Sequence, residues 1–402
     1  MVTVSSIGMR AAERESESER MRAFLDEVFQ PLHRAEQRRW AREYLWGLIH
    51  LPGRKTPRSM ARAGALPAGA AHGLHQFVNA SPWSWGAVRT RLARVVAESG
   101  PAYAWTVADV IIPKQGEHSV GVHRRVDPET GRTVNCQRGV GLFLMAGTRC
   151  FPVDWRLVLR GAWDWDEPRR RRARIPEAET GRPVGAFVLE YAAAVAVARP
   201  RLPDVPWVLD LTRRCDDAGG VMAGLARRGL DFLCEVDAGQ TVLAGRRSPA
   251  VTTVGELMEE PHARQPHVLP GPLRRTAARP VRVNVSARTV RLSQRGGGRD
   301  GASAAYHVLE LPPGDSGQAA RYWVTNVLDR GVEELLALAR TRAAAGATVE
   351  ELRRSFGVLD FEGRSYTGWH HHMTMASAAY AYQHLYGAAA RPADTEVKGL
   401  GT

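Results

Sequence analysis

The chain has 402 residues, of which 44% are hydrophobic and 24% charged, and its formal net charge is +13. A chain of this length and apolar content normally buries a sizeable core and holds more than one structural unit. No apolar stretch approaches the about 20 residues of a membrane helix, the N-terminus lacks the apolar segment of a signal peptide, and the four cysteines form no C-x-x-C pair. These features argue against a membrane protein, a secreted protein and a zinc ribbon.

The positive charge points to a polyanionic partner, because a strongly basic chain attracts phosphates. Nucleic acid is therefore the leading candidate. We expect a cytoplasmic, nucleoid-associated protein without a membrane partner.

Residues 1–20 are polar and charged, which predicts a disordered tail. Apolar residues then recur at helical spacing, and we predict a helical domain over residues 21–100. Ser81 and Pro82 are suited to the cap and first position of a helix over 82–98.

This helical domain is rich in basic side chains, among them Lys55 and Arg58. We predict that it grips DNA. The alternative is a helical packing module with a solvated basic face.

From about residue 103 the chain changes to short apolar runs, AWTVADVII, VGVHRRV, NCQRGVGLFLMAG and CFPVDWRLVL, which are typical of an antiparallel meander. A helix, the strand PWVLDL, a second helix and the strand DFLCEVDA follow, and these predict a β-α-β unit. Together they form the first part of a mixed α+β or α/β core, residues 101–236. A β-rich insertion with a flexible tip at RGGGRDGAS is expected over 237–320. The core closes over 321–388, and residues 389–402 form a flexible tail.

Two carboxylates stand near the ends of predicted strands, Asp109 in the first and Asp210 in PWVLDL. Carboxylates so placed, in a meander followed by strand and helix, are how ribonuclease H-like folds assemble a site for two Mg²⁺ ions. Such a site activates a water or a 3′-hydroxyl on one side and stabilises the leaving oxygen on the other.

Several longer stretches carry a resemblance to a known family: RRWAREYLWGLI, GRKTPRSMA, LHQFVNASPWSW, PKQGEHSVGVHRR, NCQRGVGLFL, PVDWRL, RYWVTN and FEGRSYTGWHHHMTMASAAYAY. They closely resemble the DDE-superfamily insertion-sequence transposases of actinobacteria, over about residues 20 to 388. The resemblance implies a helical DNA-binding region, a ribonuclease H-like core with a β-rich insertion, and Mg²⁺- or Mn²⁺-dependent cleavage at transposon ends. It also implies terminal inverted repeats of double-stranded DNA as partner and a homodimer that brings two ends together.

The first metal ligand of these relatives is the first of two aspartates that end the first strand. Ala108 stands at that position here, and Asp109 is its neighbour. Because side chains on a strand alternate between faces, Asp109 points away from the metal unless the strand end is bulged. Asp109 stays a candidate ligand on that condition.

Asp210 matches the second carboxylate of the family, with Asp216 and Asp217 as fallback candidates. An alternative role for Asp210 is to cap the turn that follows it. The motif that surrounds this carboxylate in the relatives is absent here.

The third carboxylate of the family lies on a helix between two basic residues. The match places Arg342 and Arg353 at the basic positions, where they share one helix face, but puts Gly346 at the glutamate. Glu350 lies one turn further on, displaced by about 6 Å, so it replaces the glutamate only if the helix shifts.

We predict DNA contacts at a set of basic and aromatic positions: Lys55, Arg58, Lys114, Arg342, Arg353, Arg364, Trp369 and His370. Arg169 to Arg172 are a further candidate phosphate surface. The run His370 to His372 is not expected to hold a metal, because three consecutive helical side chains point in three directions.

Two of the three expected ligands are absent, so the sequence predicts a DNA-binding transposase relative that is impaired in metal-dependent cleavage and strand transfer. One alternative is an active two-metal enzyme that uses Asp210 with Asp109, Glu350 or both. A second alternative is a basic interaction protein without a specific DNA target.

Overall fold

A computed structural model describes residues 18–126, 131–212, 215–245, 250–259, 265–269, 281–292, 305–311 and 320–387. The predicted tail at the C-terminus, most of the tail at the N-terminus and the whole predicted loop tip RGGGRDGAS lie outside the described residues. In the part that is described, no helix is long and apolar enough to cross a membrane.

The N-terminal region is helical, as predicted. Residues 18–28 form a helix, and four more follow it: α2 (Ala35–His50), α3 (Pro57–Ala63), α4 (Ala70–Asn79) and α5 (Trp85–Glu98). The predicted start of the last helix is wrong by three residues. Ser84, and not Ser81, caps α5, because its hydroxyl accepts a hydrogen bond from the Ala87 amide.

The core sheet begins with a meander of β1 (Ala102–Pro113), β2 (His123–Val126), β3 (Thr133–Ala146) and β4 (Arg149–Leu157). Two short helices, α6 (Ala162–Trp165) and α7 (Glu167–Ala173), lead to a second set of elements: α8 (Val184–Val197), the 3-10 turn η1 (Arg199–Arg201), β5 (Trp207–Asp210), α9 (Ala218–Ala226) and β6 (Phe232–Val236). The meander pairs are antiparallel, whereas β1 with β5 and β5 with β6 are parallel. The order β4-β3-β1-β5-β6 is that of a ribonuclease H-like core, and this prediction is confirmed.

The residues after β6 extend the same sheet. They form β7 (Thr241–Ala244), β8 (Ala250–Thr253), α10 (Val254–Glu259), β9 (Gln265–Leu269), β10 (Val281–Leu292), β11 (Tyr306–Leu311) and β12 (Arg321–Thr325). β12 pairs with β6, and the sheet continues through β11, β10 and β7 to β8. The inserted strands therefore share a sheet with the core.

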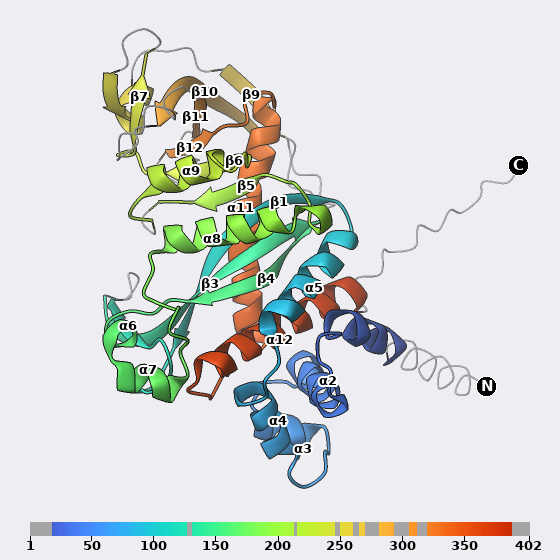
Figure 1. The fold of residues 1–402 in the computed structure, drawn as a ribbon. Helices are drawn as coiled ribbons and strands as arrows, with labels where there is room; N and C mark the ends of the chain where they lie inside the picture. Colours follow the sequence, from blue (N-terminus) through green and yellow to red (C-terminus); the bar gives the residue numbers. More distant parts are fainter. Residues whose placement is uncertain are drawn as a thin grey trace, which may run out of the picture.

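Two long helices complete the chain, α11 (Val332–Ser355) and α12 (Tyr366–Tyr386). Figure 1 shows α8 and α9 on one face of the core sheet and α11 running along the other. α12 packs against β4 and also against α2, α4 and α5, so it joins the N-terminal helices to the core.

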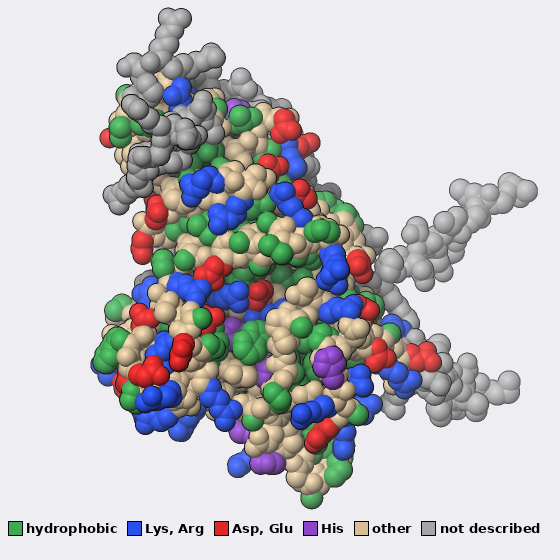
Figure 2. Space-filling model, in the orientation of Figure 1, with side chains coloured by type: hydrophobic (Ala, Val, Ile, Leu, Met, Phe, Trp, Pro, Cys, Tyr) green, Lys and Arg blue, Asp and Glu red, His purple; other side chains and the backbone are tan. Residues whose placement is uncertain are grey.

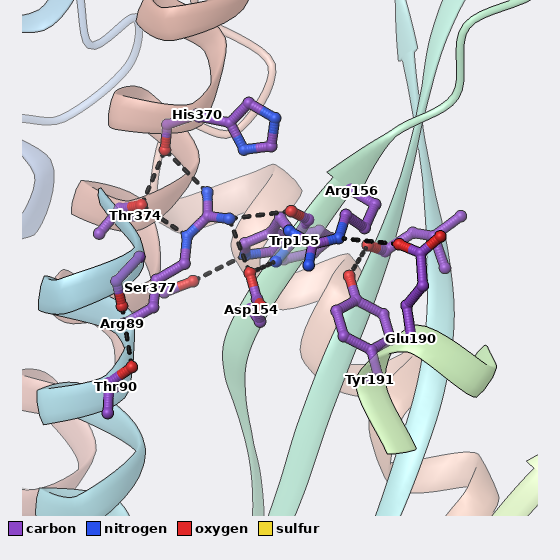
Figure 3. A network of polar contacts seen from close by, with 12 residues as sticks. Arg89, Thr90, Asp154, Trp155, Arg156, Glu190, Tyr191, His370, Thr374 and Ser377 are labelled. Carbon is purple, nitrogen blue, oxygen red and sulfur yellow. Dashed lines mark hydrogen bonds and ion pairs between the residues drawn. The ribbon is translucent and has the colours of Figure 1, made fainter. Parts of the chain in front are cut away.

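The buried guanidinium of Arg89 bonds the N-terminal helices to the core (Figure 3). Arg89 of α5 donates from Nη1 to Asp154 and to the Trp155 carbonyl of β4, at 2.7 and 2.8 Å. It also donates to the hydroxyl of Thr374 and the carbonyl of His370, both on α12. All of these contacts hold α5, β4 and α12 together around one charge.

Candidate active site at the ends of β1 and β5

The register of the parallel strands determines which side chains share a face of the sheet. Trp105 pairs with Trp207 and the next residues pair in step, so the register continued by two residues sets Ala108 beside Asp210. Side chains alternate along a strand, which puts Asp109 on the opposite face. That opposite face carries a small cavity under α8, which Asp210, at the end of β5, also reaches. It is lined by Val107, Asp109, Val184, Gly185, Val188, Leu209, Asp210, Leu211 and Cys215.

Asp109 forms an ion pair on the α8 side of the sheet. Arg138 of β3 places Nε and Nη2 at 2.7 and 2.5 Å from Asp109 Oδ2, and the two side chains are only 12% and 10% exposed. The carboxylate therefore balances a neighbouring arginine inside the fold. Asp109 and Asp210 reach the same small cavity, but among the described residues their carboxylates share no partner, since Arg342 and Thr212 bind Asp210. β1 has no bulge at Asp109, because its register shift lies between Ala102 and Ala104.

Asp210 lies on the α11 side and is 15% exposed. Its Oδ1 accepts hydrogen bonds from the amide and the hydroxyl of Thr212, at 3.1 and 2.5 Å. Its Oδ2 accepts a bond of 2.6 Å from Arg342 Nη1. The first pair of bonds is the turn-capping arrangement, and the third joins the end of β5 to α11.

A second carboxylate, which the sequence analysis did not select, lies next to Asp210. Glu235 of β6 pairs with Asp210 across the parallel strands and is 9% exposed. Arg321 of β12 donates to both of its oxygens, at 2.7 and 2.9 Å. The sequence does hold a clue to Glu235, because it lies within the apolar run DFLCEV. A carboxylate in a buried strand requires a positive or hydrogen-bonding partner.

The resemblance places Gly346 where the relatives have their third carboxylate. Gly346 of α11 is exposed, and a Cβ placed on it would meet no atom within 4 Å. Glu350, one turn on, is 58% exposed and pairs with Arg353 at 3.2 Å. Both arginines of the predicted helix face therefore have carboxylate partners, Arg342 inside the site and Arg353 outside it.

These residues do not fit a pair of divalent ions. Mg²⁺ binds oxygen ligands, and a two-metal site needs two or three carboxylates around one point. Ala108 and Gly346 supply no ligand, and guanidinium groups already contact the carboxylates of Asp210 and Glu235. Within the described ranges, no group of three or more His, Cys, Asp or Glu residues is placed to hold a metal.

The two lysines predicted to contact DNA are used inside the fold. Lys55 is 4% exposed, and its ammonium donates to the Leu51 carbonyl at 2.6 Å. Lys114 donates to the Phe361 carbonyl at 2.7 Å, and burial lowers its pKa to about 8. Burial also lowers the pKa of Lys55. Lys55 leaves the set of candidate contacts because its side chain is buried, whereas Lys114 is half-buried and stays a candidate.

Trp369 and His370 are fully buried and also leave this set. The His370 ring stacks on Trp85 with centroids 4.8 Å apart, and burial holds its pKa well below the usual range. Arg58 and Arg364 are exposed. They stay candidate DNA contacts.

The arginine run of α7 contains both residues that contact the fold and residues that are exposed. Arg170 is buried and donates to the carbonyls of Trp163, Pro176 and Glu179, and Arg169 lies over the ring of Trp163 at 4.1 Å. Arg171 and Arg172 are exposed. Only this exposed half of the run is open to phosphates.

The strand order defines a ribonuclease H-like core, with Asp210 at the end of its second parallel strand. A comparison with protein families matches residues 27–298 to the DDE superfamily endonucleases, which is more than half of the chain. The chain therefore belongs to the DDE superfamily, as its motifs predicted. A search of curated proteins gave no match.

The family match covers β1 through β6, including Ala108, Asp210 and Glu235, and ends before α11. The family has a transposase-type function, its substrate is DNA, and its members generally use a divalent metal.

Proposed function

We propose that this protein binds DNA as a transposase-type member of the DDE superfamily but does not cleave DNA by the two-metal mechanism. One observation carries the proposal. Around Asp210, where the mechanism needs carboxylates, the first strand offers the methyl group of Ala108 and the long helix offers Gly346.

Binding to DNA is supported by family membership and by the net charge of +13. Figure 2 shows Lys and Arg side chains spread over one face and interspersed with Asp and Glu. A spread of this kind fits contacts to the phosphate backbone, which position a protein on DNA without reading bases. The proposed target is the terminal inverted repeat, bound by two copies of the chain.

The active alternative, with Asp109 or Glu350 as additional ligand, has less support. Asp109 is paired with Arg138 on the other face of the sheet, and Glu350 is paired with Arg353 at the surface. Either would need a rearrangement of its strand or helix before it could share an ion with Asp210.

The test combines nicking and binding in one experiment. Purified protein is incubated with a supercoiled plasmid and with a labelled duplex of the flanking inverted repeats, in Mg²⁺, in Mn²⁺ and in EDTA. We expect a gel shift that persists in EDTA, and no nicking in either metal. An unrelated duplex and heparin serve as competitors, because a basic protein without a DNA target would bind all of them alike.

Metal-dependent nicking that disappears in Asp210→Asn would contradict the proposal. The matched control is Asp231→Asn, which removes an exposed carboxylate directly before β6, outside the candidate site. Nicking that survives both substitutions would come from a contaminating nuclease.

A further inference from the structure

Around Asp210 a positive side chain, Arg342, lies where the relatives bind metal. We propose that the guanidinium of Arg342 is the resident cation of this site and takes the place of a divalent ion. The inference rests on the proposed function, because the relatives combine a basic residue at this helix position with a carboxylate four residues on, where this chain has Gly346.

The geometry puts one cation between two carboxylates. Arg342 Nη1 donates to Asp210 Oδ2 at 2.6 Å, and Arg342 Nε lies 2.8 Å from Glu235 Oε2. The Nε–H is not aligned for a hydrogen bond, so the contact with Glu235 is an ion pair. Oxygens of two neighbouring strands thus face one positive group, as they would face a metal ion.

The charges of this cluster balance without any ion. Asp210 and Glu235 are 15% and 9% exposed, and two carboxylates so close and so little hydrated would repel each other without a cation. Arg342 supplies one positive charge and Arg321, bound to both oxygens of Glu235, supplies the other. A divalent ion that entered would have to displace a guanidinium from its carboxylates.

An arginine differs from a metal in a way that matters for the protein. Its charge persists at every pH at which proteins fold, and a chelator cannot remove it. The cluster also joins β5, β6, β12 and α11, so the arginine supplies the cross-link that a metal would supply if it were bound. The fold around the site should therefore be indifferent to metal and to EDTA.

Removal of Arg342 should expose a latent site for a divalent cation. Arg342→Gln leaves Asp210 and Glu235 on adjacent strands with one counter-charge fewer. The variant should melt at a lower temperature in EDTA and regain at least about 2 °C in millimolar Mn²⁺, because an ion that binds only the folded state stabilises it. Wild-type protein should show no shift.

The matched control is Arg353→Gln. Arg353 lies on the same helix, pairs with a carboxylate and is 34% exposed against 31% for Arg342. It should show no response to Mn²⁺. The double variant Arg342→Gln with Asp210→Asn should lose the response of the single variant.

The experiment records thermal unfolding of the full chain in EDTA and in Mn²⁺, with bound Mn²⁺ counted by electron paramagnetic resonance. Mn²⁺ bound by the wild type and lost in Asp210→Asn would overturn the inference, as would a folded Arg342→Gln that ignores Mn²⁺. If Arg342→Gln does not fold, the wild-type titration decides together with Arg342→Lys, which keeps the charge and should also exclude Mn²⁺. No DNA is present, so nicking in the earlier assay would contradict the proposed function independently of this result.

Discussion

His372 shows how a polar side chain becomes part of the core. It lies fully buried on α12 between two partners: the hydroxyl of Tyr44 is 2.9 Å from its Nδ1, and the carbonyl of Gly357 is 2.8 Å from its Nε2. A neutral ring satisfies both, because Nε2–H donates to the carbonyl while Nδ1 accepts from the tyrosine. Burial lowers the pKa of His372 to about 4.

This pKa predicts a loss of stability on acidification. Below the unfolded pKa of about 6.5 the unfolded chain takes up a proton that the folded chain refuses until about pH 4, so stability is complete above pH 6.5 and falls between 6.5 and 4. His372 should account for roughly 2 kcal/mol of the free energy of unfolding lost between pH 7.5 and pH 5. Urea denaturation at the two pH values measures the loss.

The comparison that isolates this residue is His372→Gln, whose amide can also donate and accept but does not titrate. The variant should lose about 2 kcal/mol less between the two pH values than the wild type does. An equal loss in both proteins would assign the acid sensitivity to other groups.

The packing of α5 against β4 and α12 depends on Arg89, whose side chain is 3% exposed (Figure 3). Arg89→Met keeps much of the volume but removes the counter-charge of Asp154 and one donor each from the carbonyls of Trp155 and His370. Loss of one partner of a buried ion pair costs about 3–5 kcal/mol, and we expect a decrease of this size in the free energy of urea unfolding.

Arg91, two residues further along α5, provides the control. It pairs with Glu27, and the two side chains are 29% and 54% exposed. Arg91→Met should cost less than about 1 kcal/mol. If both variants lost the same small amount, the buried network would not be what holds the three elements together.

The charge of the entire chain predicts how binding responds to salt. A protein that neutralises phosphates releases counterions, so the logarithm of its affinity falls linearly with the logarithm of salt concentration. Contact with two or more phosphates should weaken binding to the inverted-repeat duplex by about 10-fold or more between 50 and 200 mM salt.

Gel shifts or fluorescence anisotropy at several salt concentrations, all in EDTA, measure this slope. A slope near zero would contradict a phosphate-bound complex. Arg364→Gln tests one exposed candidate, because loss of a single phosphate contact should reduce the slope by about 1.

Local patterns in the sequence predicted much of the fold, because apolar periodicity and turn residues act over a few positions. The meander, the strand that ends in Asp210 and the long helix with Gly346 all form as expected. The start of α5 was misplaced because Ser81 and Ser84 are both suited to capping, and the choice depends on how Trp83 and Trp85 pack on α12.

The sequence by itself determined the superfamily, the strand alternation that separates Ala108 from Asp109, and the absence of a carboxylate at position 346, since each depends only on residue type and local order. Only the tertiary structure decided which charges meet. Glu235 of β6 pairs with both Arg321 of β12 and Arg342 of α11, and Lys55 and His370 are buried by segments far from them in sequence. Ion pairs and burial are properties of three-dimensional neighbours, and no pattern along the chain contains them.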